Sequence, residues 1–129
     1  MPERNLADIF LTAAMRDAQA YVKLASDPEL HDSLAGFHAQ QAIEKAIKAV
    51  LAHAGVRFRR THDIAELLDV LHDAGLAPPP FADRLDEFNP YAIEMRYGLV
   101  EPEGLDRPGT ETMISAVLDW AMEWLSQIR

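Results

Sequence analysis

Three polar side chains that could form a binding site share one face of a predicted helix. The segment over residues 34–51 is otherwise mostly apolar, and spacings of three and four residues place Gln41, Glu44 and Lys48 on one narrow stripe. The Lys48 ammonium could bind a phosphate, while the amide and the carboxylate could orient that phosphate or hold a base. Buried polar groups need hydrogen-bonding partners, so the fold must bring such partners to this helix.

The same stripe has a structural interpretation, which the sequence leaves open beside the binding one. Glu44 and Lys48 form an i, i+4 pair in the favourable order, and a buried pair of this kind needs further hydrogen bonds. Asp17, from the apolar face of an earlier helix, and Arg96 could supply them. We expect Asp17 and Glu44 to belong to a structural polar network that fixes the helix register. For Lys48, Arg96 and Tyr97, binding is favoured.

The basic residues gather in one part of the chain. The net charge of −9 argues against duplex DNA as a partner, because proteins bind duplex DNA by neutralising its phosphates with Lys and Arg. Residues 1–62 hold 8 Lys or Arg and 7 Asp or Glu, whereas residues 63–129 hold 4 and 14. An anion should bind first at the basic region, although a helix C-terminus also attracts cations through its dipole. This region consists of Lys45, Lys48, Arg57, Arg59 and Arg60.

Composition indicates one domain over residues 1–129, with enough apolar content, 49%, to form a core. The absence of cysteine removes disulfide and thiolate chemistry. The start of the chain lacks the pattern of a signal peptide, and no apolar run is long enough to span a membrane. We therefore expect a cytoplasmic protein without a membrane partner.

The sequence predicts neither a metal site nor a cofactor. No glutamate is followed three positions later by histidine, as a carboxylate-bridged di-metal bundle requires. His31 and His38 could share a helix face, but they lack further ligands and are expected to be surface side chains. A glycine-rich phosphate-binding loop is also absent from the sequence.

Helical spacing of apolar residues recurs along the chain, and strand signals are absent. Because the links are mostly short, the helices should pack against their neighbours in alternating directions. The predicted fold is all-α, a mostly antiparallel bundle of four long helices plus one short helix. The helices are expected at about residues 5–26, 30–54, 61–75, 81–95 and 108–129.

Local signals set the helix boundaries. Gly55 and Gly75 are natural C-terminal stops for the second and third helices. Asp63 with Glu66 is typical of a capping box at the start of the third. Pro90 should kink or split the fourth helix after the preceding residue. The loop over residues 98–109 is the one long connection, a place where function is often found.

Four short pieces of the chain match the pattern of a known family. They are Arg16-Asp17 with Ala20, the segment FHAQQAIEKAIKAVL at 37–51, Thr61-His62-Asp63-Ile64, and Tyr91 with Arg96-Tyr97. In this order and spacing they resemble the HEPN domain, whose name abbreviates higher eukaryotes and prokaryotes nucleotide-binding. The resemblance covers essentially the whole chain, and the Gln-Gln-Ala-x-Glu-Lys-x-x-Lys core is its most specific part.

The resemblance implies a small helical bundle that is commonly a dimer. Some members are metal-independent ribonucleases, and others bind nucleotides or RNA without cleaving them. Many act with a minimal nucleotidyltransferase in a two-protein system. The polar stripe, the basic region and the late segment then supply the candidate nucleotide-binding residues, which are Gln41, Lys45, Lys48, His62, Arg96 and Tyr97.

The ribonucleases of the family carry an arginine followed, after four to six residues, by a histidine. Arg96 best matches that arginine, but no histidine stands at these spacings. Glu101 occupies the shortest spacing, where a carboxylate repels the phosphate that a histidine would serve. A literal match exists at Arg57 and His62, in the link between the second and third helices, where His62 is better explained by the helix start.

We therefore predict a non-catalytic nucleotide- or RNA-binding or interaction module. It is expected to act as a homodimer with a minimal nucleotidyltransferase partner, in a toxin–antitoxin-like pair. The alternative is a metal-independent ribonuclease that uses an atypical site, with Arg57 and His62 as its catalytic residues.

Overall fold

A computed structural model describes residues 5–92 and 104–127, and all elements named here lie within these ranges. They are α1 (Leu6–Ala25), α2 (Asp32–His53), α3 (Ile64–Asp73), the 3-10 helix η1 (Leu85–Phe88) and α5 (Arg107–Ser126). The described residues contain no strand, so the all-α class is confirmed. None of these helices combines the length and apolar character that a membrane crossing requires.

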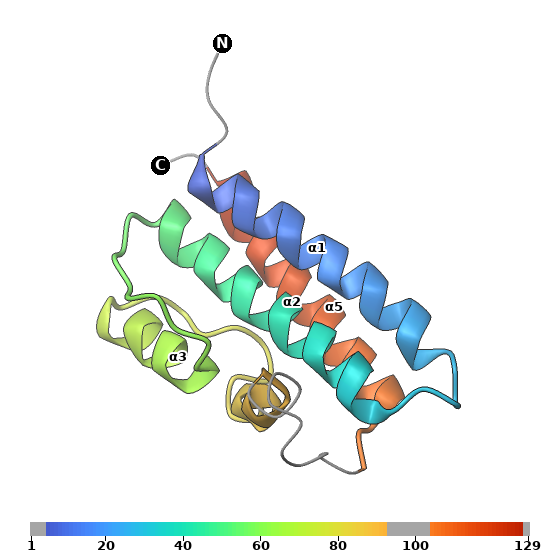
Figure 1. Ribbon diagram of the computed structural model, residues 1–129. Coiled ribbons are helices and arrows are strands. Elements are labelled where there is room, and N and C mark those ends of the chain that lie inside the picture. Colours follow the sequence, from blue (N-terminus) through green and yellow to red (C-terminus); the bar gives the residue numbers. More distant parts are fainter. Residues whose placement is uncertain (1–4, 93–103, 128–129) are drawn as a thin grey trace.

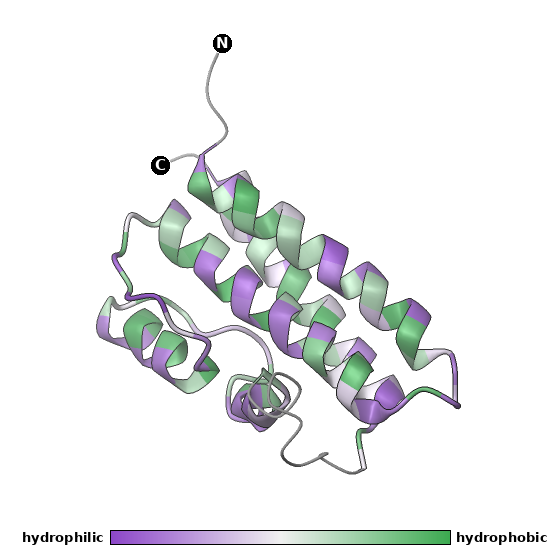
Figure 2. Cartoon of the chain, viewed as in Figure 1, coloured by the Kyte–Doolittle hydropathy of each residue, from purple (hydrophilic) through white to green (hydrophobic). Residues whose placement is uncertain are grey.

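The long helices α1, α2 and α5 lie side by side, and each contacts the other two (Figure 1). α1 is antiparallel to both α2 and α5 (Figure 1). α3 and η1 also pack against α2, which makes α2 the central helix that the sequence predicts. Of its 22 residues, 14 are buried. Figure 2 shows hydrophilic residues set among apolar ones in the middle of this helix.

The segment after α3 differs in detail from the expected helix over 81–95. Phe81 adopts a positive φ of 60° in a turn, and a regular helical turn forms only from Leu85 onward as η1. Residues 89–92 are α-helical, so the helix type changes at Asn89, where the split was expected. Pro90 thus sits in the first turn of the new helical segment, where its missing N–H costs no hydrogen bond.

A close approach between α2 and this segment depends on Gly36. A Cβ atom at Gly36 would overlap the ring of Tyr91, which is buried. Phe88 packs beside that ring with 6.4 Å between the ring centroids. Because Gly36 has no side chain, the helical segment at 89–92 lies directly on α2. Arg96 and Tyr97 follow this segment a few residues later in the sequence.

Side-chain caps begin three of the helices. Asn5 Oδ1 accepts the N–H of Asp8 in α1, and Asp106 Oδ1 accepts that of Gly109 in α5. Asp63 accepts the N–H groups of the second and third residues of α3. The predicted capping box is half present, because Glu66 binds the Arg59 guanidinium through both carboxylate oxygens instead.

Arg107, at the start of α5, holds the turn between α1 and α2. Its guanidinium donates to Asp32 Oδ1 at 3.0 Å and to the carbonyl oxygens of Ala25, Asp27 and Leu30. The Tyr21 hydroxyl donates in turn to the Arg107 carbonyl oxygen at 2.7 Å. Burial raises the pKa of Tyr21 to about 12, so its hydroxyl stays protonated and donating through neutral pH.

Replacing Arg107 by lysine should lower the free energy of unfolding by about 2 kcal/mol, because one ammonium cannot reach all four acceptors. Urea unfolding of the variant and the wild type measures this difference. Arg84→Lys is the matched control, since Arg84 is exposed and makes a long ion pair of 3.4 Å. Equal, small effects of the two substitutions would contradict the role of Arg107.

Candidate functional site

The Glu44 carboxylate lies inside the protein and has three partners within residues 5–92 and 104–127. Its side chain, on α2, is 3% exposed, and that of Lys48 is 8% exposed. Lys48 Nζ donates to Oε2 at 2.9 Å, and Gln40 Nε2 donates to Oε1 at 2.8 Å. His62 Nδ1 lies 3.0 Å from Oε1. A buried carboxylate is stable only when its lone pairs are satisfied in this way. We call Glu44 and these three partners the polar centre.

Gln40, which sequence reasoning missed, is the innermost of the two adjacent glutamines. It is fully buried, and its amide nitrogen donates both to Glu44 and to the backbone oxygen of His62, the latter at 3.1 Å. Gln41 contacts this centre through Gln40 Oε1, to which it donates at 2.6 Å. The available signal was the spacing of four residues that relates Gln40, Glu44 and Lys48 along one row of the helix.

These contacts fix the link between α2 and α3 onto α2. The backbone of His62 accepts from Gln40, and its imidazole contacts Glu44, although the side chain remains 49% exposed. His62 therefore serves the polar centre at the start of α3. The residues just before it, 56–61, are held next to the C-terminal half of α2.

Asp17 belongs to a second cluster. It accepts from Lys45 Nζ at 2.7 Å and lies 2.9 Å from His38 Nδ1. This differs from the single network of Asp17 with Glu44 that the sequence predicts, because Asp17 faces a neighbouring row of α2. His38, expected at the surface, is instead partly buried against Asp17. Arg96 lies outside the described residues.

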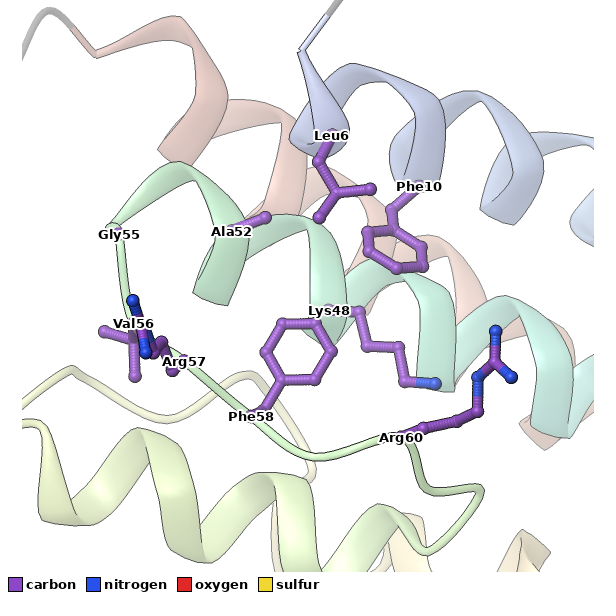
Figure 3. A pocket seen from close by; sticks show the side chains of 9 residues that line it. All are labelled: Leu6, Phe10, Lys48, Ala52, Gly55, Val56, Arg57, Phe58 and Arg60. Atoms are coloured by element: carbon purple, nitrogen blue, oxygen red, sulfur yellow. The ribbon is translucent and has the colours of Figure 1, made fainter.

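A pocket of about 610 Å³ opens beside Lys48, between α1, α2 and the link (Figure 3). Phe10 and Phe58 form an aromatic wall, with 6.1 Å between their ring centroids. Lys48 Nζ lies 5.9 Å from the centroid of the Phe10 ring, and the electron-rich face of this ring attracts the positively charged ammonium group. The lining consists of Leu6, Phe10, Lys48, Ala52, Gly55, Val56, Arg57, Phe58 and Arg60.

The predicted basic region divides into paired and unpaired cations. Lys45 is paired with Asp17, and Arg59 with Glu66, whose hydrogen bonds and charge raise the pKa of Arg59 further. Arg57 and Arg60 are exposed, line the pocket and form no ion pair within residues 5–92 and 104–127. These two guanidinium groups are therefore available to an anion.

The predicted binding residues do not all meet at this pocket. Lys48 lines it, whereas Gln41 and His62 belong to the polar centre behind and Lys45 to the Asp17 cluster. Arg96 and Tyr97 lie outside the described residues. Sequence reasoning missed the aromatic wall. Its signal was a phenylalanine set among arginines at 57–60, a pattern typical of surfaces that bind nucleic acid.

Comparison with known proteins agrees with this fold. The model of the HEPN domain family matches residues 7–125. The chain belongs to the HEPN domain family. A crystal structure of ST0689, an archaeal HEPN homologue, has 24% sequence identity to this HEPN chain and a TM-score of 0.55. That match covers 96% of this chain and 94% of the other, and it supports the fold. No curated protein matches the sequence.

Replacing Glu44 by glutamine should lower the free energy of unfolding by about 2–3 kcal/mol, because Lys48 then stays buried without a counter-charge. Glu87→Gln is the control, since Glu87 pairs with Arg84 at the surface, and its effect should stay under about 0.5 kcal/mol. Urea unfolding of both variants measures the contrast. A Glu44→Gln protein as stable as the control variant would show that the polar centre is unimportant for stability.

Proposed function

We propose that this HEPN chain is a non-catalytic module that binds a nucleotide or RNA through the pocket beside Lys48. The observation that carries this proposal is the combination of unpaired Arg57 and Arg60 with an ordered Lys48 and an aromatic wall in one cavity. Guanidinium groups suit phosphate oxygens because they present several donors in one plane. The chain has a net charge of −9, so the cations that line this pocket stand out against an acidic background.

The polar centre argues for binding without cleavage. Metal-independent cleavage requires a general acid or base, most often a histidine, that is free to exchange protons at the phosphate. His62 is engaged with Glu44 and is absent from the lining of the pocket, where Arg57 lies. The late segment after Arg96 also lacks a histidine in the sequence. Arg57 and His62 have the spacing of the ribonuclease motif, but we interpret them as residues of the link between α2 and α3. We therefore propose no catalytic residue.

Neutralising the two unpaired arginines should weaken ligand binding in steps. We expect Arg57→Gln and Arg60→Gln each to raise the dissociation constant for ATP or a short single-stranded RNA roughly three- to tenfold. The double variant should lose more and show a weaker dependence on salt concentration. Isothermal titration calorimetry measures these changes, with Arg84→Gln, outside this pocket, as a charge-matched control.

Two outcomes would contradict the proposal. The first is that the wild type shows no saturable binding of any nucleotide or RNA. The second is metal-free cleavage of RNA that disappears in Arg57→Ala or His62→Ala, which would favour the ribonuclease alternative.

We also propose that the chain acts in the cytoplasm as a homodimer, paired with a minimal nucleotidyltransferase in a toxin–antitoxin-like system. Membership of the HEPN family supports the proposed pairing with a nucleotidyltransferase. Exposed Met15 and Val22, seven residues apart on one face of α1, support self-association, because a second copy packed there would remove their apolar surface from water.

The homodimer should have twice the mass of one chain, which is 14.4 kDa. Light scattering after size-exclusion chromatography measures it, and Met15→Lys with Val22→Lys should shift the mass toward that of one chain. The control is Ala74→Lys, which places the same charge at an exposed position outside α1. A mass of 14.4 kDa at every concentration would remove the homodimer from the account.

A further inference from the structure

We propose that the pocket beside Lys48 takes one unpaired nucleobase together with its phosphate. The ligand would then be a nucleotide unit, which binds more tightly than a bare phosphate or a sugar phosphate. This inference rests on the proposed function and deepens it, because it assigns separate roles to the aromatic and the cationic parts of the pocket.

The aromatic part is one continuous wall. The rings of Phe10 and Phe58 are tilted by 51° and contact each other, so no base fits between them. Both side chains are partly exposed to the cavity. Because Lys48 Nζ lies against the ring of Phe10, Phe58 offers the better surface for a base to stack on. Leu6, Ala52 and Val56 extend the apolar lining around these rings.

The cationic part lies next to this wall. Figure 3 shows the Lys48 ammonium and the Arg60 guanidinium at the same end of the cavity, with the ring of Phe58 beside the Lys48 stem. Glu44 holds the ammonium in place from behind, so its position is set before a ligand arrives. A phosphate at this end and a base on Phe58 are joined by one ribose in a nucleotide, which matches the side-by-side arrangement.

The size of the cavity and the stacking requirement narrow the ligand class. A volume of about 610 Å³ lies within the usual range of roughly 300–1,000 Å³ for sites that hold one small molecule. In a duplex, both faces of a base are covered by its neighbours, and only its edges are accessible. The ligand is therefore a free nucleotide or an unpaired nucleotide of a single strand.

The test separates the base from the phosphate. Calorimetric titrations of the full chain use AMP, ribose 5-phosphate and adenosine as probes. We expect AMP to bind roughly five- to hundredfold more tightly than ribose 5-phosphate, the range that stacking of one base supplies. Phe58→Leu should abolish this difference without changing the affinity for ribose 5-phosphate, whereas Arg60→Gln should weaken both phosphate ligands alike.

Matched controls keep the test decisive. Phe81→Leu changes an exposed phenylalanine outside the pocket and should leave all three affinities unchanged. Phe10→Leu is a second variant of the wall, for use if thermal unfolding shows that Phe58→Leu does not fold. A single-stranded oligoribonucleotide that binds more tightly than AMP, with the same dependence on Phe58, supports a strand as the source. Equal affinities support a free nucleotide.

Two results would contradict the inference alone, and a third would contradict the proposed function as well. Equal binding of AMP and ribose 5-phosphate, with no selective effect of either phenylalanine variant, would overturn it while leaving an anion site. Duplex RNA that binds as tightly as a single strand, with the same dependence on Phe58, would overturn it as well. If none of the phosphate probes nor RNA binds, the proposed function itself fails.

Discussion

The arrangement of this protein depends on one buried carboxylate. Glu44 lies on a helix that is packed on most sides, so water cannot satisfy its charge, and the chain must supply the partners. Two of them, Gln40 and Lys48, come from the adjacent turns of α2, and the third, His62, comes from the link to α3. Because Gln40 also binds the His62 backbone, satisfying the carboxylate fixes the path of the link.

That path creates the pocket. Once the link is held at His62, its preceding residues pass along α2, and Phe58 reaches Phe10 of α1. The position of the link also determines which of its arginines form an ion pair within the protein. Arg59 turns toward Glu66 of α3 and is neutralised, whereas Arg57 and Arg60 line the cavity without an ion pair in the described ranges. Lys48 thus belongs both to the structural network, through its pair with Glu44, and to the lining of the pocket that we propose as a binding site.

The parts of the fold that the sequence predicts well are those set by local chemistry. The cap at Asp63 and the stop at Gly55 depend on a few neighbouring residues, and the apolar period of α2 marks it as central. The partner of Asp17 and the meeting of Phe10 with Phe58 depend on which row of α2 faces α1 and on how the link folds back. These are long-range properties, which periodicity along one helix does not contain.

The most direct measurement of the central claim is the NMR signal of the lysine ammonium groups. The chain has three lysines, and an exposed ammonium such as that of Lys23 exchanges its protons with water too fast to be observed at neutral pH. The account predicts an observable Lys48 signal that disappears in Glu44→Gln, while that of Lys45, bound to Asp17, is unchanged by the substitution. A Lys48 ammonium that behaves like Lys23, or that ignores the loss of the Glu44 charge, would contradict it.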